Sequence, residues 1–477
     1  MPLASSLATA SAPAWVGRVD ALNAQGVALR RAGQAQAACA AYRQALALCP
    51  ETEPARAVLW RHLALALGDL GDWPGACEAA QHAATLAMQT PASGAASSPI
   101  VPAGAAPLTQ NPAPGFAQKV RLDWARALAC SGHPERAREQ YQLALRAGPE
   151  GPGLPTARYS LALLDLLEGD WVSGWAGLEA RWQHSLAQGR RPDMQRPWWQ
   201  GEPLGQGASL LVMDEQGLGD TLQFVRLLPL LRQRLPQTPL HLLCRQNLLR
   251  LLRPWAQRWG VQLHHWDENW QALISHQVML LSLPHCLGLR QPQLRALTAQ
   301  FTPGYLSVAS GPPLRLPSGG PLRVGLVWRG NPDYALRHAR DLPLSALASL
   351  CTTPGVQWLN LQMGGAPEWA QTEGLPPVHD ASAHWQDLAD TAHTLCHALD
   401  LVLTVDTAMA HLAGALGVPV WLLNRHDSDW RWGNSGQDSV WYPSMRIFRQ
   451  SRPRDWSAPL QEVQHALQAL LQHAHHP

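Results

Sequence analysis

The chain has 477 residues, of which 46% are apolar and 15% are charged, and its formal net charge is +2. This composition predicts a globular protein of two or three domains, because one hydrophobic core rarely serves so many residues. The nearly neutral charge favours no particular partner, and the scattered arginines do not form the patch expected for nucleic-acid binding. No run reaches the ~18 apolar residues that a membrane-spanning helix requires.

The basic side chains and the cysteines limit which residues can bind an anion or a metal. Lys119 is the only lysine among 37 basic residues, so a side chain that binds an anion elsewhere has to be arginine or histidine. The eight cysteines show no CxxC or other ligand spacing, which predicts reduced packing residues and no metal site. The first 15 residues lack a basic segment followed by a sustained apolar core, so no secretion signal is predicted. We expect a cytoplasmic protein.

The first region, residues 15–185, is predicted to be a helical domain of stacked hairpins. A weaker copy of the hairpin pattern described next spans 59–90, and a fourth copy begins at Ala157. Small residues let antiparallel helices approach closely, an aromatic side chain fills the gap to the next hairpin, and proline ends the second helix. This spacing matches the tetratricopeptide repeat, and four hairpins are enough to stack. Two copies of the pattern have identical spacing. The first contains Gly33, Ala38, Tyr42, Ala45 and Pro50, and the other contains Gly132, Ala137, Tyr141, Ala144 and Pro149.

Two segments of this half are predicted to connect folded parts. Residues 91–115 are rich in Pro, Gly, Ala and Ser, which predicts a flexible insertion between the second and third hairpins. Residues 186–208 are polar and punctuated by Pro and Gly, which indicates a linker. Within this linker, Trp198 and Trp199 predict that part of it packs against a neighbour.

Short β-prone runs alternate with helical segments from residue 209 onward, and this alternation is typical of parallel sheets. The proline- and glycine-rich segment 311–321 divides them into two Rossmann-like lobes, 209–315 and 321–450, and a C-terminal helix follows at 451–477. The predicted fold class is therefore α plus α/β, with ligands at the carboxyl ends of the strands. The predicted strands are 209–213, 240–244, 324–328, 356–361, 400–405 and 418–423.

A glycine turn with an acidic residue follows the first strand. Gly217 and Gly219 precede Asp220, which opens a helix predicted over 220–231. The segment lacks the lysine of a phosphate loop, and Leu222 stands where a dinucleotide-binding GxGxxG requires its last glycine. Triphosphate hydrolysis is therefore not predicted, and hydride transfer is a minor alternative. The position of Asp220 suits either a helix-start acid, which position alone favours, or a general base.

The most informative segment is 400–424, where an apolar strand runs into Asp406 and Thr407 and a helix begins at Ala408. Either polar residue can cap the helix. The N–H groups of such a helix start suit a phosphate or diphosphate at the carboxyl edge of the sheet. An ordinary capped helix without a ligand has the same sequence features, and His411 in this helix is also compatible with a core histidine.

Several ordered motifs carry a family resemblance over most of the chain. They include DEQGLGDTLQFVRLLPLL (214–231), VGLVWRGNP (324–332), the long segment 387–421, and DSDWRWG continuing to SVWYPSMRIFRQ (427–450). Together with the repeats, they resemble bacterial tetratricopeptide proteins whose catalytic region is similar to family 9 glycosyltransferases and, more distantly, to O-GlcNAc transferases. The resemblance implies the GT-B fold: two Rossmann-like lobes, a nucleotide-sugar donor held mainly by the second, and no metal or other cofactor.

The resemblance also implies roles for single residues. Asp220 aligns with the catalytic base of heptosyltransferase-like enzymes, which reverses the preference for a mere helix-start acid. The loop after Asn331 departs from the family pattern, because Asp341 stands where a small hydroxyl residue is expected, so Arg337 and Arg340 stay alternatives for one role. The implied donor-binding residues are Gly217, Gly219, Trp328, Arg329, Asn331, Arg340, Gln362, Asp406, Thr407, Ala408, His411, Trp430 and Arg431.

Asp427 and Asp429 imitate a metal-binding DxD, but that motif belongs to the other major glycosyltransferase fold, so we interpret it as a coincidence. The predicted function is an inverting glycosyltransferase that transfers a sugar to an acceptor hydroxyl, with a protein acceptor recruited by the repeats. Two alternatives stay open. One is a non-catalytic repeat scaffold with a degenerate GT-B region, and the other is a heptosyltransferase of the lipopolysaccharide type.

Overall fold

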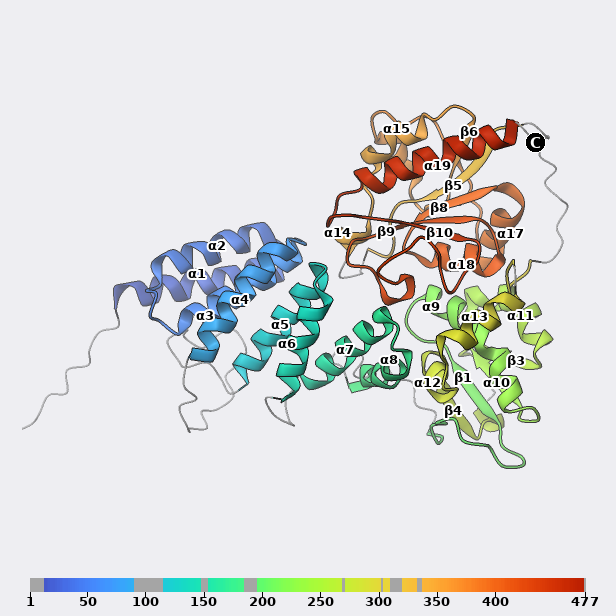
Figure 1. Ribbon diagram of the computed structural model, residues 1–477, viewed down its shortest axis with the longest axis horizontal. Coiled ribbons are helices and arrows are strands. Elements are labelled where there is room, and N and C mark those ends of the chain that lie inside the picture. The colour runs from blue at the N-terminus through green and yellow to red at the C-terminus, as the bar shows by residue number, and fades with distance from the viewer. Residues whose placement is uncertain are drawn as a thin grey trace, which may run out of the picture. The chain divides into compact units, whose positions relative to one another are not determined.

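The computed structural model describes residues 13–89, 115–146, 153–183, 195–267, 271–301, 303–308, 320–332 and 337–475. The predicted insertion apart from Gly115, the first half of the predicted linker, and residues 311–319 between the predicted lobes lie outside the described residues. The chain divides into two compact units, one ending at Arg158 and the other beginning at Tyr159. Figure 1 shows helices alone in the first unit and two sheets with helices in the second.

The first unit consists of antiparallel helices in which each helix packs on the next. α4 contacts α5 although the predicted insertion separates them in sequence. The pattern of small and aromatic residues has a direct cause, because a Cβ on Gly26 would lie 2.4 Å from Cε1 of Tyr42. The helices are α1 (Ala14–Arg31), α2 (Ala35–Leu48), α3 (Ala55–Asp69), α4 (Trp73–Gln89), α5 (Phe116–Cys130) and α6 (Pro134–Arg146).

The turn glycines of the hairpins share one backbone conformation. Gly33, Gly71 and Gly132 have φ angles of 75°, 71° and 79°. A side chain in this left-handed region clashes with the backbone, so glycine is the residue of choice where two helices are joined so tightly. This explains why glycine recurs at this point of the predicted hairpins.

Most of the fourth predicted hairpin belongs to the second unit, because the boundary between the units falls within its first helix. It consists of α7 (Leu154–Glu168) and α8 (Trp171–Leu178), followed by a short 3₁₀ helix, Glu179–Gln183. The Trp175 ring makes edge contacts with Phe224 and Trp430 at centroid distances of 6.1 and 5.3 Å. Trp171 stacks on Trp441 at 5.4 Å. These aromatic contacts attach the end of the predicted repeat domain to the α/β region.

The first lobe has a four-stranded parallel sheet in the order β3-β2-β1-β4. β1 (Leu210–Met213) and β2 (Leu240–Leu243) match predicted strands, whereas β3 (Val261–His264) and β4 (His276–Met279) were not predicted. Both missed strands contain histidine and glutamine in place of a continuous apolar run. Ahead of the sheet, the backbone N–H of Trp199 donates to the carbonyl of Gln277 in β4 at 2.9 Å, so the end of the predicted linker packs on this lobe.

The helix predicted over 220–231 is broken in the structure. α9 (Leu218–Phe224) and α10 (Leu228–Arg234) are separated by a 3₁₀ turn, Val225–Leu227. Pro229 explains the break, because proline lacks an N–H and its ring clashes with the carbonyl four residues earlier. The other helices of this lobe are α11 (Gln246–Arg258), α12 (Leu283–Cys286) and α13 (Gln291–Gln300).

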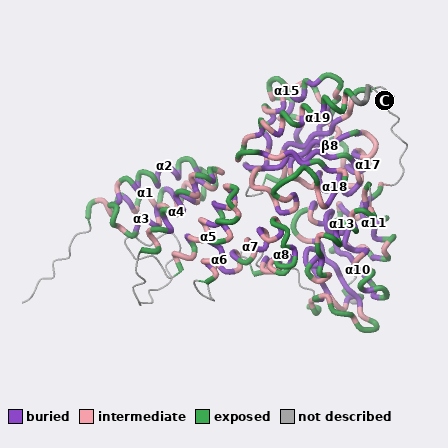
Figure 2. Tube along the Cα trace, viewed as in Figure 1, coloured by how far each residue is buried: buried purple, intermediate pink, exposed green. Residues whose placement is uncertain are grey.

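The second lobe has a six-stranded parallel sheet in the order β10-β9-β8-β5-β6-β7. Its two faces pack into different cores, because Val402 of β8 joins the core shared with the first lobe while Leu401 and Leu403 face the other one. Figure 2 shows β8 as buried chain. The strands are β5 (Leu322–Val327), β6 (Val356–Asn360), β7 (His379–Asp380), β8 (Leu401–Val405), β9 (Val420–Asn424) and β10 (Met445–Arg449).

Helices cover both faces of this second sheet. α17 (Leu388–Ala398) and α18 (Ala408–Leu416) lie on one side, and α15 (Ala348–Cys351) and α19 (Ser457–His475) lie on the other (Figure 1). The short helices α14 (Arg337–Arg340) and α16 (Ala366–Gln371) follow β5 and β6. The fold is therefore the predicted one, helical hairpins followed by two Rossmann-like lobes. Among the described residues, no helix is both long and apolar enough to cross a membrane.

Candidate functional site

Asp220 is fixed at the start of α9, directly after the carboxyl end of β1. Its Oδ2 accepts a hydrogen bond from the backbone N–H of Gly217 at 2.8 Å. Asp220 therefore caps the first turn of its own helix. The carboxylate is 16% exposed. Asp220 is thus a helix-start acid. Its second oxygen, Oδ1, accepts from Arg431 of the second lobe.

The loop from β8 to α18 holds the second part of the candidate site. Thr407 is the N-cap, and its side chain accepts from the N–H of Met409 at 3.2 Å. Gly417 ends the helix in the left-handed conformation. Asp406, Thr407 and Ala408 are each partly exposed. The positive end of the helix dipole therefore lies at a partly exposed position, which suits an anion.

Strand register brings the remaining predicted residues of the second lobe to the same edge. Val327 of β5 pairs with Thr404 of β8, and Leu326 pairs with Asn360 of β6. Trp328, Arg329 and Gln362 therefore come level with the end of β8, because parallel strands end along one edge of a sheet. Gln362 accepts from the N–H of Arg329 at 3.1 Å.

The side chains that follow β5 form hydrogen bonds and an ion pair with a neighbouring acid. Arg329 forms an ion pair with Glu368, which also accepts from Nε1 of Trp328 at 3.3 Å. The Trp328 ring is 1% exposed and lies in a core, so it supports the loop from below. Glu368 was missed by the sequence analysis, since nothing in its local pattern marks it.

Arg340 lies beneath the same loop. It donates to the carbonyl of Asn331 at 3.2 Å and lies 3.4 Å from Oδ1 of Asp341, which in turn accepts from Gly330 N–H at 3.2 Å. The Arg340 side chain is 10% exposed, whereas Arg337 donates to the carbonyl of Pro332 and is exposed. Asp341 therefore has a defined role in tying the loop that departs from the family pattern.

The two lobes meet where α9 and α18 touch. A Cβ on Gly219 would lie 2.6 Å from Cδ2 and 3.3 Å from Nε2 of His411, so glycine is required for this approach. Nδ1 of His411 is 2.8 Å from the hydroxyl of Tyr442. Burial, and then the charges of Arg431 and Arg226, hold the pKa of His411 well below its ordinary value of 6.5. A neutral His411 can position neighbours but cannot supply positive charge.

Arg431 joins the two lobes across the candidate site. Its Nε donates to Oε1 of Gln223 at 2.8 Å, and Nη2 donates to Oδ1 of Asp220. Nη1 lies 3.0 Å from Oδ1 of Asp429 on the same loop. Burial lowers the pKa of Arg431, but the carboxylates of Asp429, Asp220 and Asp406 outweigh this effect and raise it above its ordinary value. The guanidinium is therefore a permanent cation among three carboxylates.

Asp406 belongs to the same charge cluster. Burial, followed by the carboxylate of Asp429, raises the pKa of Asp406, and Arg425 and Arg431 oppose the rise. The pKa of this carboxyl group therefore depends on the same charges that surround Arg431.

The loop that carries Arg431 is organised by its own acids and by an aromatic core. Asp429 accepts from the N–H of Arg431 at 3.0 Å and caps a 3₁₀ turn, Trp430–Trp432. Asp427 lies 3.5 Å from Arg425. Both acids of the DxD-like sequence are therefore paired with arginines. The Trp430 side chain is 7% exposed and packs among aromatic rings. Of the two neighbours Trp430 and Arg431, it is therefore Arg431 that faces Asp220.

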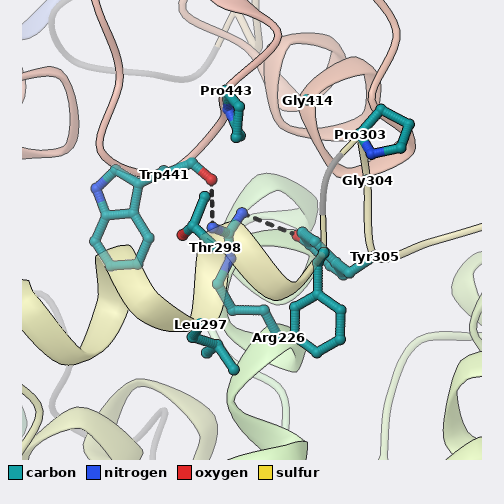
Figure 3. A pocket seen from close by; sticks show the side chains of 10 residues that line it. Arg226, Leu297, Thr298, Pro303, Gly304, Tyr305, Gly414, Trp441 and Pro443 are labelled. Atoms are coloured by element: carbon teal, nitrogen blue, oxygen red, sulfur yellow. Dashed lines mark hydrogen bonds between the residues drawn. The ribbon is translucent and has the colours of Figure 1, made fainter.

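A buried arginine next to the site was missed by the sequence analysis. Arg226, in the turn after α9, lies 4.6 Å from the Tyr305 ring centroid and 4.5 Å from that of Tyr442. It also donates to the carbonyl of Trp441 and lines a small pocket with Thr298 (Figure 3). An arginine within the apolar run LQFVRLLPLL was the available signal. Its role is to join the lobes behind His411.

Comparison with known proteins finds only distant similarity among the proteins described next. No model of a known protein family matches the chain. Protein FlbA of Caulobacter vibrioides is 26% identical over 94% of this chain and 72% of its own length. A family 9 glycosyltransferase from Veillonella parvula aligns with 55% of this chain and 97% of its own, at 14% identity and a TM-score of 0.36. A mutant O-GlcNAc transferase from Thermobaculum terrenum aligns with 97% and 95%, at 13% identity and a TM-score of 0.33.

Proposed function

We propose that the chain is an inverting glycosyltransferase that transfers a sugar from a nucleotide-diphosphate sugar to an acceptor hydroxyl. One observation carries the proposal: Asp220, which follows the carboxyl end of a strand in the first sheet, pairs with Arg431 of the second lobe, and its helix α9 contacts α18, whose start follows the carboxyl end of β8 in the second sheet. Ligands of doubly wound folds bind at such edges. A carboxylate beside a built anion site is the pair of groups that this reaction requires.

The reaction follows from these groups. Oδ1 of Asp220 takes the proton of the acceptor hydroxyl while the acceptor oxygen forms a bond to the anomeric carbon from the side opposite the diphosphate. The bond between the anomeric carbon and the diphosphate oxygen breaks, and its electron pair leaves with the diphosphate. The N–H groups at the start of α18 and the Arg431 guanidinium stabilise that charge. Inversion at the anomeric carbon follows from this single displacement, which uses no metal.

The first test is thermal unfolding with UDP-, GDP-, ADP-, CMP- and dTDP-linked sugars. We expect one donor class to raise the unfolding temperature by about 2–4 °C or more, because ligand that binds only the native state stabilises it. The shift should disappear in Asp406→Ala and Thr407→Ala. Thr352→Ala is the matched control, since this exposed threonine bonds only the carbonyl of Ser349 on the far helix α15. No shift with any donor would favour the non-catalytic scaffold.

The acceptor we propose is a protein held by the helical hairpins of the first unit. Stacked hairpins form extended surfaces suited to polypeptide binding. We expect a chain that begins at Gly153, which keeps α7 and α8 with the lobes they pack on, to retain donor binding but lose most transfer to protein. The measurement is incorporation of labelled sugar into the precipitated protein and the extracted lipid of a lysate of the source organism. Undiminished transfer to lipid would instead support the heptosyltransferase alternative.

A further inference from the structure

Arg431 binds one carboxylate of its own loop and two side chains of the other lobe. Its bonds to Asp429 lie within one short loop, whereas its bonds to Gln223 and Asp220 cross from the second lobe to the first. Its side chain is 12% exposed, so water replaces little of this pairing. A small shift of the guanidinium would break the cross-lobe bonds and keep the bond to Asp429.

The cross-lobe pair occupies the oxygen that the proposed reaction uses. Oδ2 of Asp220 accepts from Gly217 N–H at 2.8 Å, and Oδ1 accepts from Arg431. An acceptor hydroxyl therefore competes with the guanidinium for Oδ1. This oxygen has a second lone pair, but it is fully available to the hydroxyl proton only once Arg431 loosens its contact.

A diphosphate is the ligand chemistry that can draw Arg431 away. The planar guanidinium binds two phosphate oxygens at once, and such charge-assisted pairs are among the strongest hydrogen bonds in proteins. The start of α18, where the proposed donor diphosphate binds, follows β8, and the Arg431 loop follows the adjacent strand β9. Both phosphate-binding elements therefore lie at one edge of one sheet.

We propose that Asp220 and the donor diphosphate compete for Arg431, so that binding of the diphosphate releases Asp220 to act as the base. This inference rests on the proposed function, because it takes the donor to be a nucleotide-diphosphate sugar. It assigns Arg431 two roles in sequence, as the partner of the base and as a ligand of the leaving group. It also means that the base becomes available only after the donor has bound, which limits unproductive encounters with the acceptor.

The test is a double-mutant cycle on the binding of ADP, GDP and UDP, measured by titration calorimetry on the full chain. Asp220→Asn should tighten binding of the preferred diphosphate by about fivefold or more, because the competing carboxylate is gone. Arg431→Gln should weaken binding. In the Arg431→Gln background, Asp220→Asn should no longer tighten it, because the group that the two anions share is missing.

Asp400→Asn is the matched control, since it removes the same charge from another aspartate paired with arginine, at the opposite end of β8, 2.7 Å from Arg323. It should leave affinity within about twofold. Equal tightening by Asp220→Asn in both backgrounds would overturn the inference in favour of simple charge repulsion, as would no tightening beyond Asp400→Asn. If the wild type binds none of the three diphosphates and does not bind dTDP either, the proposed function fails as well. Asp220→Ser replaces Asp220→Asn if circular dichroism shows that the latter is unfolded.

Discussion

We expect Asp220→Asn to lower the rate of sugar transfer by about 10²–10⁴-fold, the usual contribution of a general base. Asparagine has the same shape, and its amide oxygen can still accept the hydrogen bond from Gly217 N–H that closes the first turn of α9. An amide cannot take a proton at neutral pH, so the acceptor hydroxyl would have to attack without assistance. The loss of activity should therefore appear in kcat, and the substitution should leave the fold unchanged.

The measurement is steady-state transfer with the donor identified by thermal unfolding, alongside circular dichroism and the unfolding temperature of each variant. Asp400→Asn serves again as the control, because it makes the same chemical change at an arginine-paired aspartate away from the site, and it should keep near wild-type transfer. Full activity in a folded Asp220→Asn protein would show that another group accepts the proton. In that case Asp220 would be only the acid that opens α9.

The lobes and the edge that carries the site could be predicted because they depend on local patterns. The run at 401–405 is apolar except for Thr404, and such a run predicts a strand buried between two layers. Its neighbour β5 has the same character, and parallel strands end at one edge. The resemblance assigned Trp328 and Asp406, which follow these strands, to one donor site, and the strand register brings the two strand ends to the same edge.

The contacts between the lobes could not be predicted from these patterns. Arg431 and Asp220 are far apart in sequence, and nothing local distinguishes Arg431 from the other arginines of its region. Trp430 next to it was assigned to the donor end of the cleft, but its ring packs against Trp175 and Trp441. The aromatic core that α8 shares with both lobes decides which side chain of the loop faces inward, and that core forms only in the folded unit.

The same reasoning makes Arg226 the residue whose loss should most disturb the joint between the lobes. We expect Arg226→Met to lower the free energy of unfolding of the second unit by about 2–4 kcal/mol, because two buried carbonyls lose their donor. Nε of Arg226 donates to the carbonyl of Gln223 at 2.9 Å, and Nη1 donates to the carbonyl of Trp441 in the other lobe. Nη2 is 3.4 Å from the Tyr305 hydroxyl. Methionine would restore much of the volume but none of these donors.

The size of the effect depends on burial, and Arg232 offers the comparison. It also donates to backbone carbonyls, those of Trp259 at 3.1 Å and Gly260 at 2.8 Å among them, but it is partly exposed, whereas Arg226 is 1% exposed. Water can replace Arg232 at its carbonyls, so Arg232→Met should cost less than about 1 kcal/mol. Urea unfolding of both variants, followed by tryptophan fluorescence, measures the difference. Equal losses would mean that the hydrogen bonds of Arg226 add little, and that the aromatic rings alone join the lobes behind His411.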